Sequence, residues 1–374
     1  MSGYLFSNPQ VKKWKTLFFL SLLLNVILVI VIFVRREEIS LENQEDSSSI
    51  STKSGDAEPG VEATEQSGEK SVTSGAENKS VKSEYISGEP LSGSVEIEEN
   101  FFSAFSQSKE VAAFAADTGI STLSSLLSAH ISRLLMWDIV LRSDARKKDK
   151  INFVFRVIPD DEKKKRDDMP DLIEIIAVSY DSKKFNKEIR VYKFSPAKTN
   201  FSKYYYSDGT MIEKIISPFT PIKKYLQVTS LLNDRMPKHE GVDFKAAVGT
   251  PIYSTTEGTV SRKNWMTKYN GYCVEIEEKG KPFTYKYLHL SEILVDIGQK
   301  VKPGDYIANS GNTGKTTAPH LHYQINLGQK GKAIDPFLHH KTVIEKLSGE
   351  NEKNFRSFVI DIDRLLNEKN APLP

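Results

Sequence analysis

Cysteine and an excess of one charge sign are what this sequence most clearly lacks. Its 374 residues include one cysteine, Cys273, so no disulfide can join two parts of the chain. Cys273 lies in an apparent strand, Tyr272 to Glu277, where we expect a buried small hydrophobic side chain. The 51 Lys and Arg residues nearly cancel the 49 Asp and Glu residues, leaving a formal net charge of +2. Nucleic-acid-binding proteins show clustered basic residues and a high pI, so we predict no nucleic-acid partner.

Large apolar residues are nearly absent between residues 37 and 100, where Ser, Glu, Gly, Lys and Thr predominate. Such a segment cannot bury enough surface to offset the entropy lost on ordering. We therefore predict a disordered linker over residues 37–100. Flexible-chain scaling gives it a root-mean-square span on the order of 45 Å.

Charged residues are absent from residues 17–34, an apolar run that only Ser21 and Asn25 interrupt. At about 1.5 Å per residue, a helix of this length just spans a hydrocarbon core of about 30 Å. A cleaved signal peptide is the alternative, but the run exceeds the usual apolar region and no small-x-small cleavage site follows it. We expect residues 1–36 to be a cytoplasmic stub and an uncleaved transmembrane anchor that binds the cytoplasmic membrane through residues 17–34.

Histidine is scarce as well, with seven in the chain, yet four of them lie in compact motifs in the C-terminal third. These are His239, His289, His320 and His322, and the first motif adds Asp243. Two neutral imidazoles and one carboxylate make a common three-ligand catalytic zinc site, whose fourth position stays open for water. That count fits His239, Asp243 and one histidine of the His-Leu-His pair.

The spacing of the second motif predicts a strand. Residues 319–327 read Pro-His-Leu-His-Tyr-Gln-Ile-Asn-Leu, where apolar and polar positions alternate. On a strand His320 and His322 share one face while Leu321 points into the core. One of the two histidines can then bind metal, and the other stands about 7 Å along the strand facing substrate. The helical motif His-Glu-x-x-His is excluded, because position 243 is Asp and Gly241 is a poor helix former.

With these motifs in place, residues 237–338 resemble the catalytic domain of the M23 (LytM/lysostaphin-type) zinc metallopeptidases, which cleave peptide bonds in bacterial peptidoglycan. The family's first motif, His-x-Gly-x-Asp, stands at residues 239–243, and its second, His-x-His, at residues 320–322 after the Gly-rich loop 310–314. Further family landmarks follow in the expected order at residues 249–252, 257–260, 287–290, 301–305 and 334–336.

The resemblance implies a role for each of the five residues. His239, Asp243 and His322 would bind one Zn2+, and His289 and His320 would be the two unligated catalytic histidines. Bound zinc lowers the pKa of its water and polarises the scissile carbonyl. One free histidine takes the proton of the attacking water and passes it to the leaving amine, and the other stabilises the oxyanion. The sequence leaves open which histidine does which.

The region before the catalytic domain has a mixed pattern. Within residues 121–142, Leu123, Leu127 and Leu134 lie on one helical stripe with His130, which we expect to pack in the core. Strand-like runs follow at residues 151–158, 172–180, 189–194 and 201–206. A helix followed by antiparallel strands indicates an α+β domain, which we place at residues 101–228. It resembles, more weakly, the accessory domain of membrane-bound M23 endopeptidases.

The resemblance implies a mainly-β, LytM-like catalytic domain, an antiparallel sheet with a groove, over residues 229–340. The linker that leads into this domain, residues 229–238, departs from the family, which has a Phe-Gly-x-Arg stretch and a longer segment before the first histidine. His339 and His340 follow the last catalytic strand and are expected to be exposed. Residues 352–368 carry apolar side chains at helical spacing, so we predict a C-terminal helix within residues 341–374 that packs on the body of the protein.

Together these observations predict a zinc-dependent endopeptidase that hydrolyses cross-links or stem peptides of peptidoglycan in cell-wall remodelling. We expect a single-pass protein of the cytoplasmic (inner) membrane with an extracytoplasmic, periplasmic catalytic domain, and protein regulators as possible further partners. The short connection between the two domains gives a high effective concentration at the groove, which motivates the hypothesis that the accessory domain docks on the catalytic domain and inhibits it. The sequence leaves this question open. The alternatives are a metallopeptidase acting on other peptides, and a non-catalytic wall-binding regulator or activator of another murein hydrolase; the complete ligand set argues against the latter.

Overall fold

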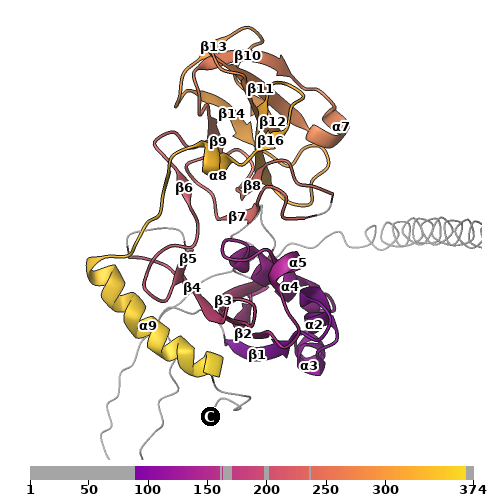
Figure 1. Cartoon of the computed structure of the whole chain (residues 1–374), viewed down its shortest axis with the longest axis vertical. Coiled ribbons are helices and arrows are strands. Elements are labelled where there is room, and N and C mark those ends of the chain that lie inside the picture. The colour runs from indigo at the N-terminus through magenta and orange to yellow at the C-terminus, as the bar shows by residue number, and fades with distance from the viewer. Residues whose placement is uncertain (1–88, 161, 163–170, 198–201, 236, 368–374) are drawn as a thin grey trace, which may run out of the picture. The chain divides into compact units, whose positions relative to one another are not determined.

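The computed structural model describes residues 89–160, 162, 171–197, 202–235 and 237–367 (Figure 1). The expected anchor at residues 17–34 and most of the expected linker lie outside the described residues. Within the described ranges, no single helix is long and apolar enough to cross a membrane. A pair of consecutive helices, Lys109–Thr118 and Leu123–Leu135, passes that test of length and composition only together and is bent by 113°.

Five antiparallel strands form the first sheet. Their order is β1 (Leu91–Glu96), β2 (Lys150–Val157), β3 (Ile173–Ser182), β4 (Lys187–Phe194) and β5 (Lys203–Tyr206). The last four agree with the strand-like runs of the sequence. The expectation of a disordered linker up to residue 100 is wrong for β1, which pairs with β2 from Leu91↔Phe155 to Glu96↔Lys150. Val95 and Ile97 are buried, and this burial fixes the segment.

Helices α2 (Phe101–Ser106), α3 (Lys109–Thr118), α4 (Leu123–Leu135) and α5 (Leu141–Asp144) share an apolar core with this sheet (Figure 1). Asn100 caps α2, because its side chain accepts hydrogen bonds from the N–H groups of Phe102 and Ser103. The helix expected over residues 121–142 ends earlier, at Leu135. There the N–H groups of Asp138 and Ile139 both donate to the Leu135 carbonyl, which closes the last turn.

The C-terminal helix α9 (Gly349–Asn367) belongs to the same body. Its apolar residues form one core with side chains of β2, β3 and β4, so the predicted helix packs on the first sheet (Figure 1). The buried residues of α9 are Phe355, Phe358, Ile362 and Leu366. Burial of each such side chain stabilises the fold by about 1.5–3 kcal/mol. The first sheet is therefore part of a body built from two separate stretches of the chain.

The second sheet contains ten strands, and all its pairings are antiparallel. This confirms the expected mainly-β antiparallel catalytic fold. Its central path runs β13-β10-β11-β12-β15-β8-β7, with β14, β9 and β16 attached. The bounds are β7 (Gln227–Ser230), β8 (Val242–Lys245), β9 (Pro251–Tyr253), β10 (Gly258–Lys263), β11 (Tyr272–Glu278), β12 (Phe283–Ile293), β13 (Lys300–Val301), β14 (Tyr306–Ser310), β15 (His320–Leu327) and β16 (Ala333–Ile334).

Two short helices, α7 (Thr267–Asn270) and α8 (Pro336–His339), accompany this sheet. A separate two-stranded ladder pairs β6 (Ile215–Ile216) with β17 (Thr342–Val343). The ladder therefore joins the segment that enters the second sheet to the segment that leaves it.

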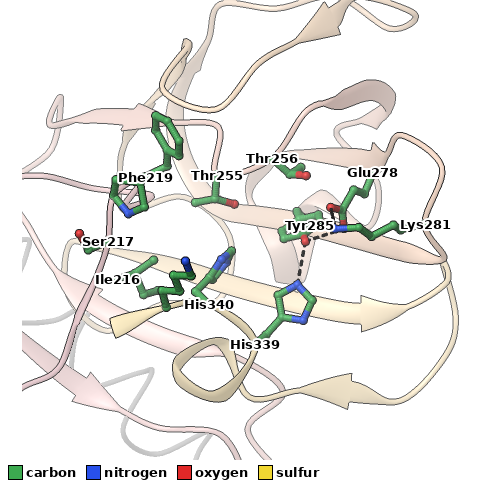
Figure 2. A pocket seen from close by; sticks show the side chains of 12 residues that line it. Ile216, Ser217, Phe219, Thr255, Thr256, Glu278, Lys281, Tyr285, His339 and His340 are labelled. Atoms are coloured by element: carbon green, nitrogen blue, oxygen red, sulfur yellow. Dashed lines mark hydrogen bonds and ion pairs between the residues drawn. The ribbon is translucent and has the colours of Figure 1, made fainter. Parts of the chain in front are cut away.

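His339 and His340 are half-buried, so the expectation that they are exposed is wrong (Figure 2). His339 Nε2 lies 2.9 Å from the Tyr285 hydroxyl, and His340 Nε2 lies 2.7 Å from the Tyr323 hydroxyl. Both rings line a cavity of about 220 Å³ that Glu278 and Tyr285 also line. Burial, with the neighbouring His339, lowers the pKa of His340 to about 4. The sequence pattern placed Tyr323 inside a strand but could not place either tyrosine hydroxyl group against these rings.

Candidate active site

Three side chains of the two sequence motifs converge between β8 and β15. The register pairs His322 directly with Asp243, and His239 lies just before β8. His239 Nε2 and His322 Nδ1 lie 3.0 Å and 2.9 Å from Asp243 Oδ1, and 3.1 Å from each other. All three residues are buried. Atoms bound at about 2.0–2.1 Å to a tetrahedral zinc lie about 3.3 Å apart, so this donor set fits a metal centre.

Hydrogen bonds outside the cluster fix which nitrogen of each imidazole faces it. His239 Nδ1 lies 2.9 Å from the Leu231 carbonyl oxygen, so Nδ1–H donates there and Nε2 presents its lone pair to the cluster. His322 is reversed: its Nε2 lies 3.2 Å from Gln324 Oε1, and its Nδ1 faces the cluster. Two imidazole lone pairs and a carboxylate repel at such distances unless a proton or a cation lies among them. This arrangement again fits a bound metal ion.

Asp243 is ionised in this environment. Burial by itself would raise the pKa of its carboxyl group, but when the facing imidazole nitrogens carry protons, hydrogen bonds and charge from His239 and His322 lower it well below its usual range. Its second oxygen accepts a hydrogen bond of 3.2 Å from the guanidinium of Arg235. The carboxylate therefore supplies the one negative charge of the ligand set.

Gly241 explains why the first motif needs a glycine between its two ligands. A Cβ atom at this position would lie 2.5 Å from the Tyr323 carbonyl oxygen and 2.7 Å from His322 Nε2. Real Cβ atoms essentially never come so close to other atoms. The absent side chain thus allows the segment before β8 to pass close against β15, which brings His239 to His322.

His289 and His320 lie beside this cluster, as the sequence predicts. Their ring centroids are 4.7 Å apart, and His320 Nε2 lies 3.7 Å from Asp243 Oδ1. Each donates Nδ1–H to a carbonyl, His289 to Thr313 at 2.9 Å and His320 to Ala318 at 2.8 Å. Burial, with the neighbouring His320, lowers the pKa of His289 to about 4, and burial also lowers the pKa of His320. Both rings are therefore neutral near pH 7, with a free lone pair at Nε2.

The Gly-rich loop between β14 and β15 holds His289 in place. Its Thr313 hydroxyl donates to the Leu290 carbonyl at 2.7 Å and accepts from the Tyr272 N–H at 2.9 Å. Gly314, with φ +79°, passes so close to Gly271 that a Cβ would lie 2.2 Å from the Gly271 nitrogen. The loop is thus fastened to β11, and His289 itself adopts a left-handed φ of 63° that few non-glycine residues tolerate.

Sequence reasoning missed the groups that orient the two ligand histidines. Gln324 lies two residues after His322 on the same strand face, so the alternation that predicted the strand was a usable signal for it. The Leu231 carbonyl offered no signal, because every residue carries one. Asp234 holds that segment, accepting hydrogen bonds from the Leu231 N–H at 2.7 Å and the Ser230 hydroxyl at 2.8 Å. The linker at residues 229–238, which departs from the family, therefore holds the carbonyl that orients His239.

Comparison with known proteins matches residues 237–336 to peptidase family M23. Peptidoglycan DD-endopeptidase ShyB of Vibrio cholerae is 32% identical over 198 residues, which cover 48% of this chain and 45% of that protein. An uncharacterized metalloprotease of Haemophilus influenzae is 40% identical over 114 residues, 30% of this chain and 23% of that protein. The solved catalytic domain of lysostaphin from Staphylococcus simulans is 35% identical over 27% of this chain and 78% of that chain, with a TM-score of 0.27.

The chain thus spans less than half the length of these two curated relatives. The matched stretch nevertheless includes both motifs and all five residues of the candidate site. Residues 237–336 of this protein form a peptidase family M23 domain.

Proposed function

We propose that this protein is a zinc-dependent endopeptidase that hydrolyses peptide bonds of bacterial peptidoglycan, in cross-links or stem peptides, during cell-wall remodelling. The observation that carries the proposal is the pair of neutral histidines, His289 and His320, beside the His-Asp-His cluster. A purely structural metal site would need no such pair. The likeness to proteins named as peptidoglycan DD-endopeptidases supports the substrate class.

One Zn2+ held by His239, Asp243 and His322 would supply a Lewis acid and an acidified water. The other steps belong to the chain's own residues. His289 and His320 each offer an Nε2 lone pair, so one of them accepts a proton from the attacking water at Nε2 and returns it to the leaving amine. The other ring, once it has taken a proton from solvent at Nε2, donates from that nitrogen to the oxygen that gains negative charge. The carbonyls of Thr313 and Ala318 keep both rings oriented throughout.

The test is digestion of isolated peptidoglycan sacculi by the purified full-length protein, followed by mass spectrometry of the released muropeptides. We expect new peptide ends from the wild-type protein, and none from the His320→Ala variant or after removal of zinc by a chelator. A parallel digestion of casein separates a wall-specific enzyme from a general peptidase. An unchanged muropeptide profile with the zinc-loaded protein would favour the non-catalytic regulator.

The proposal extends to location. Residues 17–34 would hold the protein in the cytoplasmic membrane by a single pass, and the M23 domain would lie outside, where its substrate is. The apolar run itself supports this arrangement, since it is long enough to span about 30 Å of hydrocarbon. Protein regulators that act on the M23 domain belong to the same proposal.

A further inference from the structure

A row of polar side chains, three of its four members buried, continues the sheet face that bears His322. Cross-strand pairing places Arg262 opposite Glu275, Glu275 opposite Lys286, and Lys286 opposite Gln324. Glu275 is 0% exposed and Lys286 is 9% exposed. Gln324, at the end of the row, accepts the hydrogen bond that orients His322. The row therefore leads directly to the candidate metal ligand.

The charges in this row do not balance. Glu275 is already saturated, since it accepts from Arg262 Nε at 2.9 Å and Nη2 at 2.8 Å, from the Ser261 hydroxyl at 3.0 Å and from the Gln329 amide at 3.2 Å. Lys286 Nζ lies 3.9 Å from Glu275 and donates at 3.1 Å to the Gln329 carbonyl. Within the described part of the chain, no carboxylate lies within hydrogen-bond distance of this ammonium. Two cations thus share one anion.

A lysine in this position is short of partners. An ammonium carries three N–H donors, and a cation removed from water is destabilising unless it is paired. Burial lowers the pKa of Lys286; Glu275 and Glu240 raise it, and Arg262 lowers it further. The carboxylate of Glu240 is exposed and accepts its hydrogen bond from Gln324, at 3.3 Å. An incoming carboxylate would complete both the charge and the hydrogen bonds of the ammonium.

We propose that Lys286 is a specificity-determining residue whose ammonium pairs with a carboxylate of the peptide substrate close to the scissile bond. The inference rests on the proposed function, because it takes the bond to be cut beside His322. Lys286 lies on β12 opposite Gln324. Gln324 lies two positions, or about 7 Å, along β15 from His322. An extended peptide covers this distance in about two residues. The preferred substrate is therefore an acidic peptide, and a bridge of glycines alone would leave the lysine unpaired.

The experiment compares two forms of one substrate with the full-length, zinc-loaded protein. Cross-linked muropeptides are used with their native carboxylates, and after conversion of those carboxylates to primary amides with carbodiimide and ammonia. We expect the wild-type kcat/KM to be about 10-fold or more higher for the native form, since charged hydrogen bonds are the stronger ones. Lys286→Met should raise KM for the native form and bring the ratio near one, while the amidated form is cleaved at the wild-type rate.

Two further variants sharpen the result. Lys286→Arg keeps the charge and should retain part of the preference. Lys279→Met removes one positive charge from an exposed ion pair with Glu257 in the turn between β11 and β12, and should leave the ratio unchanged. Equal wild-type kcat/KM for the two forms would overturn the inference while the proposed function stands, and that comparison needs no variant to fold. If neither form were cleaved, the proposed function itself would be overturned.

Discussion

The ligand histidines and the free histidines should respond differently to substitution. His239→Ala, Asp243→Ala or His322→Ala should each sharply reduce the zinc content of the purified protein, because two remaining protein ligands make a poor site. His289→Ala and His320→Ala should keep zinc and lose about 10²- to 10⁴-fold in rate. Elemental analysis and muropeptide turnover measure the two effects. Zinc lost from His320→Ala but kept by His322→Ala would mean that the two strand positions have been exchanged.

Gly241 offers a test of the close approach between the two motifs. Gly241→Ala should lower zinc content and destabilise the fold by about 1–3 kcal/mol, because the new Cβ overpacks against Tyr323 and His322. Gly280→Ala is the matched control: its Cβ would meet no atom within 4 Å, although its φ of +71° makes a side chain unfavourable there. The control should lose some stability in urea but no zinc. Equal zinc content in both variants would refute the steric explanation.

At the scale of single residues, the sequence predicted the five residues of the site through their types and spacing. The roles that divide them into ligands and free histidines stay predictions. The carbonyls of Leu231, Thr313 and Ala318, which set each imidazole's orientation, could not be predicted. A backbone acceptor has no signature in the sequence, and its position depends on how loops pack.

At the scale of elements, strand-like runs predicted β2 to β5 closely, and alternation of apolar and polar positions predicted β15. The first strand and the short helices α2 and α3 were missed. β1 reads Leu-Ser-Gly-Ser-Val-Glu and follows a long polar segment, so its composition resembles the linker before it. Only pairing with β2 identifies it as a strand, and that contact is remote in sequence.

Helix α9 should be essential to the first sheet. Phe355 is 0% exposed, and its ring centroid lies 5.3 Å from that of Phe194 and 5.8 Å from that of Tyr205. Phe355→Ala should cost about 3–5 kcal/mol in the free energy of unfolding, from lost burial and the cavity that remains. Arg356→Ala, one residue along on the exposed side, should change it by less than about 0.5 kcal/mol. Denaturant unfolding measures both, and equal effects would contradict the packing.

An ion-pair network across β2, β3 and β4 predicts how stability depends on pH. Burial alone would raise the pKa of Glu174, but Lys193 and Arg156 outweigh it and lower the pKa to about 2 from 4.5. The carboxylate therefore contributes stability above about pH 4.5, on the order of 3 kcal/mol, which is lost as the pH falls toward 2. Urea unfolding between pH 6 and pH 3 should show a shallower pH dependence for Glu174→Gln. An identical slope would assign the acid sensitivity to other groups.

For the whole molecule, the N-terminal anchor is the first feature to test. The intact chain should sediment with membranes and keep residues 1–36, because the apolar run has no cleavage site after it. Protease added from outside should cut within residues 37–88, where no fold is expected to protect the backbone. Fractionation with N-terminal sequencing measures this. A soluble form that begins near residue 37 would indicate signal cleavage instead.

Inhibition of the M23 domain by the accessory domain stays a prediction, and the structure changes how it must be tested. Deleting residues 99–225 would remove most of the first sheet but leave α9, whose apolar face would then be uncovered. A meaningful deletion removes the sheet and α9 together. The sequence could not give this boundary, because the two parts of the body are separated by the entire M23 domain.

That separation also sets an order of events during synthesis. The ribosome completes β1 to β5 early, makes the M23 domain next, and releases α9 last. At a synthesis rate of about 5–20 residues per second, one apolar face of the first sheet remains uncovered for on the order of ten seconds before α9 is made. The M23 domain can fold in that interval, since no part of its sheet comes from α9. A nascent chain can therefore contain a folded M23 domain while the first sheet is still half-covered, and it is this sheet that a chaperone would have to protect.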